Sequence, residues 1–170
     1  MSFIELASSR FSVRSFKDTP VPEDVTEKIL EAGRLAPTAR NNQPQRIIAV
    51  RSDEGLEKFR KCTSCHFNAP LAFIVCCDTE ECWKRPFDGK SSSDVDASIV
   101  ATHMMLEAAD LGIGSTWVMF FDPDKTRAEF SIPEKIEPVA VLVMGYAADD
   151  CVPSDRHSSR KSIGETVRFE

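Results

Sequence analysis

One helix, predicted over residues 93–111, constrains this chain more than any other segment. Its sequence, SDVDASIVATHMMLEAADL, carries apolar or small residues on nearly every face and is followed by Gly112. A helix with that pattern is usually buried all round, and a glycine just after the last turn is a common stop signal. A chain of 170 residues has few elements with which to cover such a helix. We therefore expect a second subunit to supply one of its walls.

The remaining segments alternate between helical and strand patterns. Residues 21–37 predict a helix that starts at Pro22 and stops at Pro37, with acidic residues in its first turn. Shorter helices are expected at 2–8 and 53–61, and strands at 46–50, 71–77, 114–121 and 137–146, with 163–170 as a closing strand. This order predicts an α+β fold in which helices pack on a mixed or antiparallel sheet.

The composition of the chain argues against some classes of function. The net charge of -6 argues against a nucleic-acid partner, because the phosphate backbone requires a basic surface. The apolar fraction of 42% is that of an ordinary globular protein, and no run approaches the roughly 20 apolar residues of a membrane span. The N-terminus lacks the apolar centre of a signal peptide. We therefore expect one cytoplasmic domain over residues 1–170, with no nucleic-acid or membrane partner.

The run CTSCH, Cys62 to His66, has the Cys-x-x-Cys-His pattern that attaches a c-type haem, and close thiols also suggest a metal or a disulfide switch. In a cytoplasmic protein, the six cysteines are expected to be reduced thiols. Cys76 and Cys77 are adjacent in a predicted strand and point to opposite faces, so they cannot complete a zinc site together. Small, buried or half-buried thiols are the favoured interpretation and no metal site is predicted, but the role of Cys62 and Cys65 stays open.

Two other stretches carry more chemistry. In SRFSVRSF, the side chains of Arg10, Ser12 and Arg14 alternate, so an extended segment would project all three to one side. Two guanidiniums and a hydroxyl on one side can receive a phosphate. A solvated edge strand is the alternative. In APTARNNQP, residues 36–44, a helix ends at a proline before small polar side chains and amides, which suit a flat heterocycle that accepts and donates hydrogen bonds.

Taken together, these stretches resemble the nitroreductase family of FMN-dependent oxidoreductases. The resemblance rests on Arg-x-Ser-x-Arg, on APTARNNQP, on GIGSTW at residues 112–117 and on a late Arg-Lys pair, and it covers nearly the whole chain in order. It implies a nitroreductase-like fold with a central, mostly antiparallel sheet flanked by helices. It also implies an intertwined homodimer with two FMN sites in its interface, each lined by both subunits.

The resemblance assigns the cofactor-binding residues by position. Arg10, Ser12 and Arg160 match the contacts to the phosphate and the ribityl chain, and Arg14 matches the basic residue near flavin N1 and O2. A loop of the other subunit and the end of a strand beside the isoalloxazine ring complete the site. The matching residues are Pro37, Thr38, Ala39 and Asn41 for the loop, and Trp117, Val118 and Met119 for the strand end.

The implied activity is reduction of nitro compounds, quinones or related small-molecule acceptors with NADH or NADPH, by a ping-pong hydride mechanism. No catalytic side chain is assigned, because the flavin itself carries the hydride. The alternative is a flavin-holding or thiol redox-sensing protein with little turnover, in which Cys62 and Cys65 form the switch. Residues 81–93 are a candidate lid, and 151–170 are expected to form a C-terminal extension that contacts the partner subunit.

Overall fold

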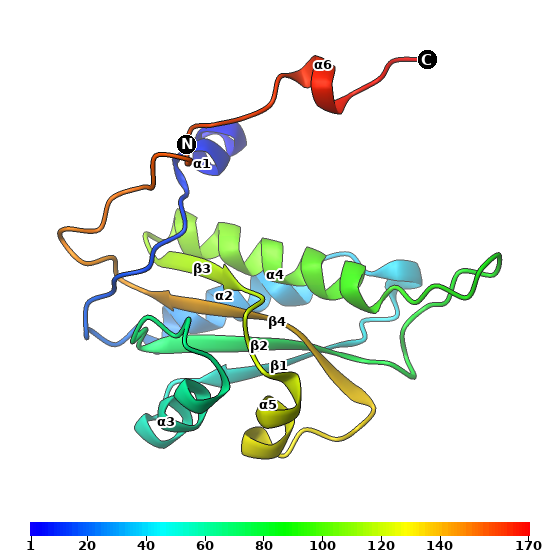
Figure 1. Ribbon diagram of the computed structural model, residues 1–170, viewed down its shortest axis with the longest axis horizontal. Helices are drawn as coiled ribbons and strands as arrows, with labels where there is room; N and C mark the ends of the chain where they lie inside the picture. The colour runs from blue at the N-terminus through cyan, green and yellow to red at the C-terminus, as the bar shows by residue number, and fades with distance from the viewer.

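A four-stranded antiparallel sheet forms the centre of the computed structural model, which describes all residues 1–170 (Figure 1). The spatial order of its strands is β1-β2-β4-β3. Helices α2 and α4 cover one face and α3 and α5 the other, so the predicted α+β fold with an antiparallel sheet between helices is confirmed (Figure 1). The strands are β1 (Gln45–Val50), β2 (Leu71–Asp78), β3 (Gly114–Val118) and β4 (Ile136–Gly145), and the covering helices are α2 (Glu23–Leu35), α3 (Asp53–Cys62), α4 (Ser93–Asp110) and α5 (Pro123–Phe130).

Strand β2 is the centre of the core, and all eight of its residues are buried. Because side chains alternate along a strand, its two sets pack into different layers. Phe73 and Val75 belong to the cluster under α2 and α4, with Met104 of α4. Ile74 and Cys76 belong to the cluster under α3 and α5. Cys76 and Cys77 therefore face opposite layers, as the sequence predicted.

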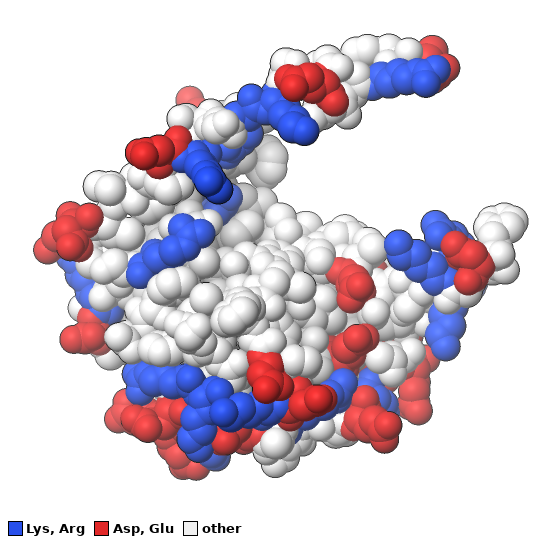
Figure 2. All heavy atoms as spheres, in the orientation of Figure 1, with Lys and Arg blue, Asp and Glu red and all other residues white.

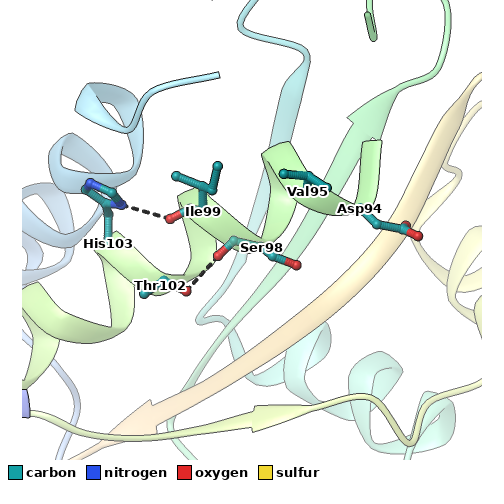
Figure 3. A pocket seen from close by; sticks show the side chains of 6 residues that line it. All are labelled: Asp94, Val95, Ser98, Ile99, Thr102 and His103. Atoms are coloured by element: carbon teal, nitrogen blue, oxygen red, sulfur yellow. Dashed lines mark hydrogen bonds between the residues drawn. The ribbon is translucent and has the colours of Figure 1, made fainter. Parts of the chain in front are cut away.

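Helix α4 lies against the sheet and against α2. A Cβ added at Gly33 of α2 would come within 2.9 Å of the Met104 Cγ atom, so the glycine permits the close approach of the two helices. The opposite side of α4 is not covered by this chain, and Val95 on it is 53% exposed. This face, which we call the α4 groove, borders a hollow of about 540 Å³ (Figure 3); its residues are Asp94, Val95, Ser98, Ile99, Thr102 and His103.

The N-terminal segment runs along the free edge of β3. The Val13 amide donates to the Ser115 carbonyl at 3.0 Å, and the Thr116 hydroxyl donates to the Val13 carbonyl. A Cβ at Gly114 would lie 2.7 Å from Val13 Cγ2, so only glycine lets Val13 sit there. The segment makes isolated bridges at Ser12 and Phe16 and no regular strand. It follows α1 (Phe3–Ser9), which begins at a Ser2–Glu5 capping box.

Two sequence predictions about strands were wrong. The strand expected over 114–121 ends at Val118, because the chain turns there and α5 follows. Helix α5 was not predicted; the Asp122 carboxylate accepts from the Lys125 amide at 2.9 Å and Pro123 occupies its first turn. The expected closing strand at 163–170 contains instead the short helix α6 (Ile163–Thr166), which a Ser162–Glu165 capping box initiates. In both places, a capping residue starts a helix that the hydrophobic pattern did not predict.

The C-terminal tail leaves the end of β4, passes α1 and then extends away from the sheet (Figure 1). Figure 2 shows an open gap between this tail and the body, and a wide, mostly uncharged surface over α4 and β3. The tail exposes the apolar side chains of Val152, Ile163 and Phe169. Both the tail and the α4 groove thus present apolar surface that nothing in this chain covers.

Phe73→Ala is expected to lower the free energy of unfolding by about 3–5 kcal/mol, because it leaves a cavity in the closely packed centre of the sheet. Phe73 is 0% exposed, whereas Phe87 is 96% exposed. Phe87→Ala is the matched control, with an expected change within about 0.5 kcal/mol. Urea denaturation followed by circular dichroism measures both variants. Equal effects of the two substitutions would contradict this account of the core.

Candidate functional site

Arg10 and Arg160 place two positive charges near each other. Arg10 is partly buried, and its burial together with the nearby charge of Arg160 lowers the pKa of its guanidinium. Neither guanidinium has an ion-pair partner among the carboxylates of the chain. Two neighbouring cations without a carboxylate repel each other. An anion between them would relieve that repulsion and gain charge-assisted hydrogen bonds.

An aromatic contact brings these two arginines together from opposite ends of the sequence. The rings of Phe11 and His157 meet edge to face, with centroids 6.1 Å apart. This contact fixes the turn that carries Arg160 beside the segment that carries Arg10. The Arg160 guanidinium is oriented further by donating to the carbonyls of His157 at 2.5 Å and Ser159 at 2.7 Å.

The other predicted residues near β3 lie on the same edge of the sheet. Ser12 bridges to Ser115 of β3, and the exposed Arg14 guanidinium donates to the Ser12 carbonyl at 3.3 Å. The backbone of Met119 lies just beyond the end of β3, and its side chain is 64% exposed. Arg10, Ser12 and Arg14 lie beside the start of β3, Arg160 lies near Arg10, and Trp117, Val118 and Met119 lie at the end of β3. We call these seven residues the β3-edge group.

The loop 37–43 lies near the opposite edge of the sheet, against the first turn of α4. It contains the 3-10 turn η1 (Ala39–Asn41) and leads into β1, which is the strand at the opposite edge of the sheet. β1 and β3 are three strand spacings apart, which is a distance of about 14 Å. No hydrogen bond or ion pair joins Pro37, Thr38, Ala39 or Asn41 to the β3-edge group of the same chain, and the first turn of α4 lies between them.

A buried carboxylate that sequence reasoning missed supports this loop. Asp96 lies in the first turn of α4, and its Oδ1 atom accepts from the Ala39 amide at 2.8 Å. The sequence carries one signal of it, an aspartate at a position where its apolar helix neighbours predict burial. Acidic residues in the first turn of a helix are common for electrostatic reasons alone, so that signal is weak.

The CTSCH run supplies a packed corner between α3 and α5. The Cys62 side chain is buried, and its burial raises the pKa of the thiol. The Thr63 hydroxyl donates to the Phe120 carbonyl and ties the run to the end of β3. The Asn68 amide donates to His66 Nδ1 at 3.0 Å, so this imidazole nitrogen is an acceptor. These hydrogen bonds give the run a structural role in the packing between α3 and α5.

No three His, Cys, Asp or Glu side chains gather in a group that could hold a metal ion. None of the helices has both the length and the hydropathy that a membrane crossing requires.

Comparisons with known proteins agree with the resemblance found in the sequence. The model described as Nitroreductase family matches residues 7–75 and 67–146. A protein of Methanothermobacter thermautotrophicus, provisionally named an NADH dehydrogenase/NAD(P)H nitroreductase, is 33% identical over 163 residues, which cover 88% of this chain and 80% of that protein.

Solved structures match as well. The crystal structure of a nitroreductase family protein from Clostridium difficile 630 is similar with a TM-score of 0.94 and 44% identity, covering 100% of this chain and 99% of the other. An FMN-dependent nitroreductase from Clostridium difficile R20291 is similar with a TM-score of 0.74 and 27% identity, covering 94% of this chain and 98% of the other.

The burial of the cysteines predicts which of them react. Burial raises the pKa of the Cys76 thiol to about 12, whereas Cys65 and Cys151 are only half-buried. In the native protein near pH 8, a thiol-reactive disulfide reagent should therefore label Cys65 and Cys151 first, since the thiolate is the reactive form. All six thiols should react after unfolding. Fast labelling that persists in a Cys65→Ser, Cys151→Ser double variant would contradict this order.

Proposed function

The chain belongs to the nitroreductase family, and we propose that it is an FMN-dependent oxidoreductase that uses NADH or NADPH to reduce nitro compounds, quinones or related acceptors. The carrying observation is the pair of guanidiniums at Arg10 and Arg160, close together and without carboxylate partners. FMN ends in one phosphate, whose oxygens can accept hydrogen bonds from both arginines at once. The chemistry of these donors therefore fits the cofactor.

The other residues of the β3-edge group fit the same proposal. In this proposal, Ser12 binds the ribityl end, and the backbone at the end of β3, from Trp117 to Met119, lies beside the flavin ring. Arg14, whose guanidinium is exposed, would stabilise negative charge at N1 and O2 of the ring. Bound FMN would supply the hydride chemistry, alternating between the nicotinamide donor and the acceptor in a ping-pong cycle. No side chain of this chain is assigned a catalytic role.

The arrangement of the two residue groups supports a homodimer. The loop 37–43 leads into β1 and the β3-edge group lies along β3, at the two opposite edges of the sheet. In this proposal, therefore, one chain supplies only part of each FMN site. A two-fold pairing through the α4 groove would bring the loop of one subunit toward the β3-edge group of the other. The same pairing would cover the exposed apolar side of α4, which satisfies the burial that its sequence demands.

Two further segments belong to the proposed dimer. The tail 151–170 carries exposed Val152, Ile163 and Phe169, which we assign to contacts with the partner subunit. The segment 81–93 projects at the N-terminal end of α4 and is assigned as a lid over the substrate (Figure 1). A cytoplasmic location suits the six cysteines, none of which forms a disulfide.

The alternative of a thiol switch finds less support. A redox-sensing thiol needs exposure and a lowered pKa, but Cys62 is buried and its pKa is raised. Cys62 and Cys65 are free in the structure. An enzyme with turnover is therefore the better reading of the site.

The purified protein should be yellow and should release free FMN on denaturation. Arg10→Ala or Arg160→Ala should raise the FMN dissociation constant about 10- to 100-fold, because each variant loses charge-assisted hydrogen bonds to the phosphate. Quenching of flavin fluorescence measures this constant. Arg51→Ala is the control, since the Arg51 guanidinium pairs with Glu23 at 3.2 Å and Arg51 directly follows β1, at the opposite edge of the sheet. Unchanged affinity in both test variants would refute the phosphate assignment.

Ile99→Lys places a charge in the α4 groove and should convert the dimer to a monomer that no longer retains FMN. Analytical ultracentrifugation and the flavin absorbance report the two effects. Ala49→Lys is the matched control, because Ala49 is exposed on β1 at the far edge of the sheet. A monomeric variant with full FMN affinity would show that one chain holds the cofactor alone.

A further inference from the structure

Asp96 is a buried carboxylate that holds two separate segments of the chain. It is 1% exposed and lies in the first turn of α4. Its Oδ1 atom accepts from the Ala39 amide at 2.8 Å, and its Oδ2 atom accepts from the Ser92 hydroxyl at 2.7 Å. A buried carboxylate with both oxygens bonded is a strong anchor, because removing it leaves the donors without partners.

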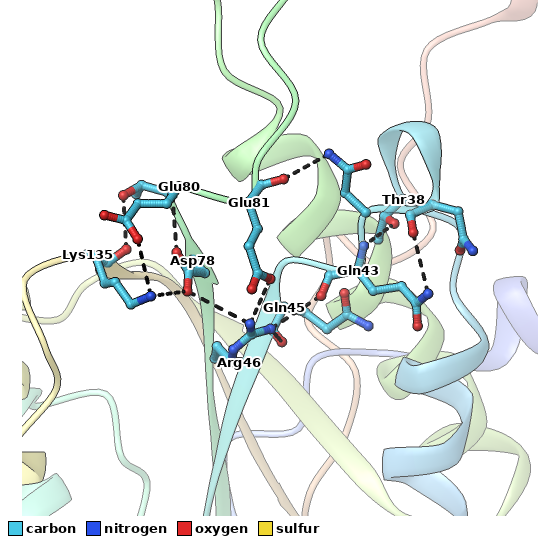
Figure 4. A network of polar contacts seen from close by, with 11 residues as sticks. Thr38, Gln43, Gln45, Arg46, Asp78, Glu80, Glu81 and Lys135 are labelled. Atoms are coloured by element: carbon cyan, nitrogen blue, oxygen red, sulfur yellow. Dashed lines mark hydrogen bonds and ion pairs between the residues drawn. The ribbon is translucent and has the colours of Figure 1, made fainter.

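The first segment is the part of the loop 37–43 from Thr38 to Gln43, whose backbone is strained; we call it the loop 38–43. Arg40, Asn41 and Gln43 all have φ between 53° and 55°, in the left-handed region that side chains disfavour. Such conformations persist only where the surroundings impose them. Besides Asp96, the Thr38 hydroxyl accepts from the Gln43 amide at 3.0 Å. The Arg46 guanidinium, which also pairs with Glu81, donates to the Gln43 carbonyl at 3.3 Å (Figure 4).

The second segment is the projecting arm of residues 81–93, which the loop contacts directly at one root and only through Asp96 at the other. At the first root, the Asn42 side chain donates to the Glu81 carbonyl at 2.9 Å. At the second root, Ser92 is bonded to Asp96, and its amide donates to the Trp83 carbonyl at 2.9 Å across the base of the arm. The arm and the loop therefore share their supports.

We propose that Asp96 is a positioning residue that holds the loop 38–43 in its FMN-binding shape and ties that loop to the root of the substrate-covering arm. This role rests on the proposed function. Because the loop of one subunit serves the β3-edge group of the other, Asp96 acts on the FMN bound mainly by the partner. Asp96 touches neither FMN nor substrate and works through Ala39 and Ser92.

Three variants separate the two supports. Asp96→Ala removes both bonds, Asp96→Asn keeps one acceptor for the Ala39 amide, and Ser92→Ala removes only the bond at the arm. Asp110→Ala is the control, because Asp110 is an exposed carboxylate at the other end of the same helix. All are compared at a temperature well below their melting transitions, with the dimer state checked.

Asp96→Ala is expected to weaken FMN binding about 10- to 100-fold, with Asp96→Asn in between. Ser92→Ala should keep FMN affinity while raising KM for the acceptor. Hydrogen exchange at the Ala39 amide in FMN-free protein should accelerate in Asp96→Ala and stay slow in Ser92→Ala. Unchanged exchange and unchanged FMN affinity in both Asp96 variants would overturn the proposal. If Asp96→Ala does not fold, Asp96→Asn and Ser92→Ala decide it by the same measurements.

A mixed dimer tests the action across the interface. In a dimer of one Arg160→Ala subunit and one Asp96→Ala subunit, both substitutions affect the same FMN site, because the loop of the Asp96→Ala subunit serves the β3-edge group of the Arg160→Ala subunit. The other FMN site is intact, so tight binding of one FMN per dimer should return. If Asp96 acted within its own subunit, both sites would be damaged and tight binding would not return, which overturns the proposal. Wild-type protein that binds no FMN would refute the proposed function itself, whereas the exchange of the Ala39 amide is measured without FMN.

Discussion

The structure depends on burying α4. This helix has an interior face that fills the space between the sheet and α2. It has a second face, around Val95 and Ile99, that the chain does not cover. Both faces follow from a sequence in which small and apolar residues surround the helix axis. The hydrophobic effect favours removing the second face from water, and the proposed dimer does so. In the proposed dimer, this pairing also positions the two segments that adjoin α4, the arm 81–93 before it and β3 after it.

Two local features are unsatisfied in a single chain and make sense together. The guanidiniums of Arg10 and Arg160 have no carboxylate partner, and the loop 38–43 keeps a strained backbone near the opposite edge of the sheet. A cofactor with a phosphate at one end and a flat ring at the other would meet both needs, provided that two copies contribute. Asp96 then links the packing of α4 to the shape of the loop.

The sequence predicted correctly the strands and helices that burial determines, and it missed the helices that a capping residue starts. β2 was predicted correctly because eight consecutive buried residues leave few alternatives. α5 was missed because its pattern is weakly amphipathic and its start depends on one aspartate, Asp122. The tail was taken for a strand from its loose alternation, but the pair of Ser162 and Glu165 starts a helical turn there. Caps act over three residues and leave little trace in hydrophobic periodicity.

The sequence by itself determined the pattern of helices and strands, because hydrophobic periodicity is a local property of the chain. Its motifs carried the family resemblance, and that resemblance supplied the candidate FMN-binding residues. Only the tertiary structure decided which of those residues lie together. It joined Arg10 to Arg160 across almost the whole length of the sequence through the Phe11–His157 contact. It also placed Thr38 and Asn41 at the far edge of the sheet, and it revealed Asp96 as their support. Such distances depend on strand order and helix packing, which no short segment encodes alone.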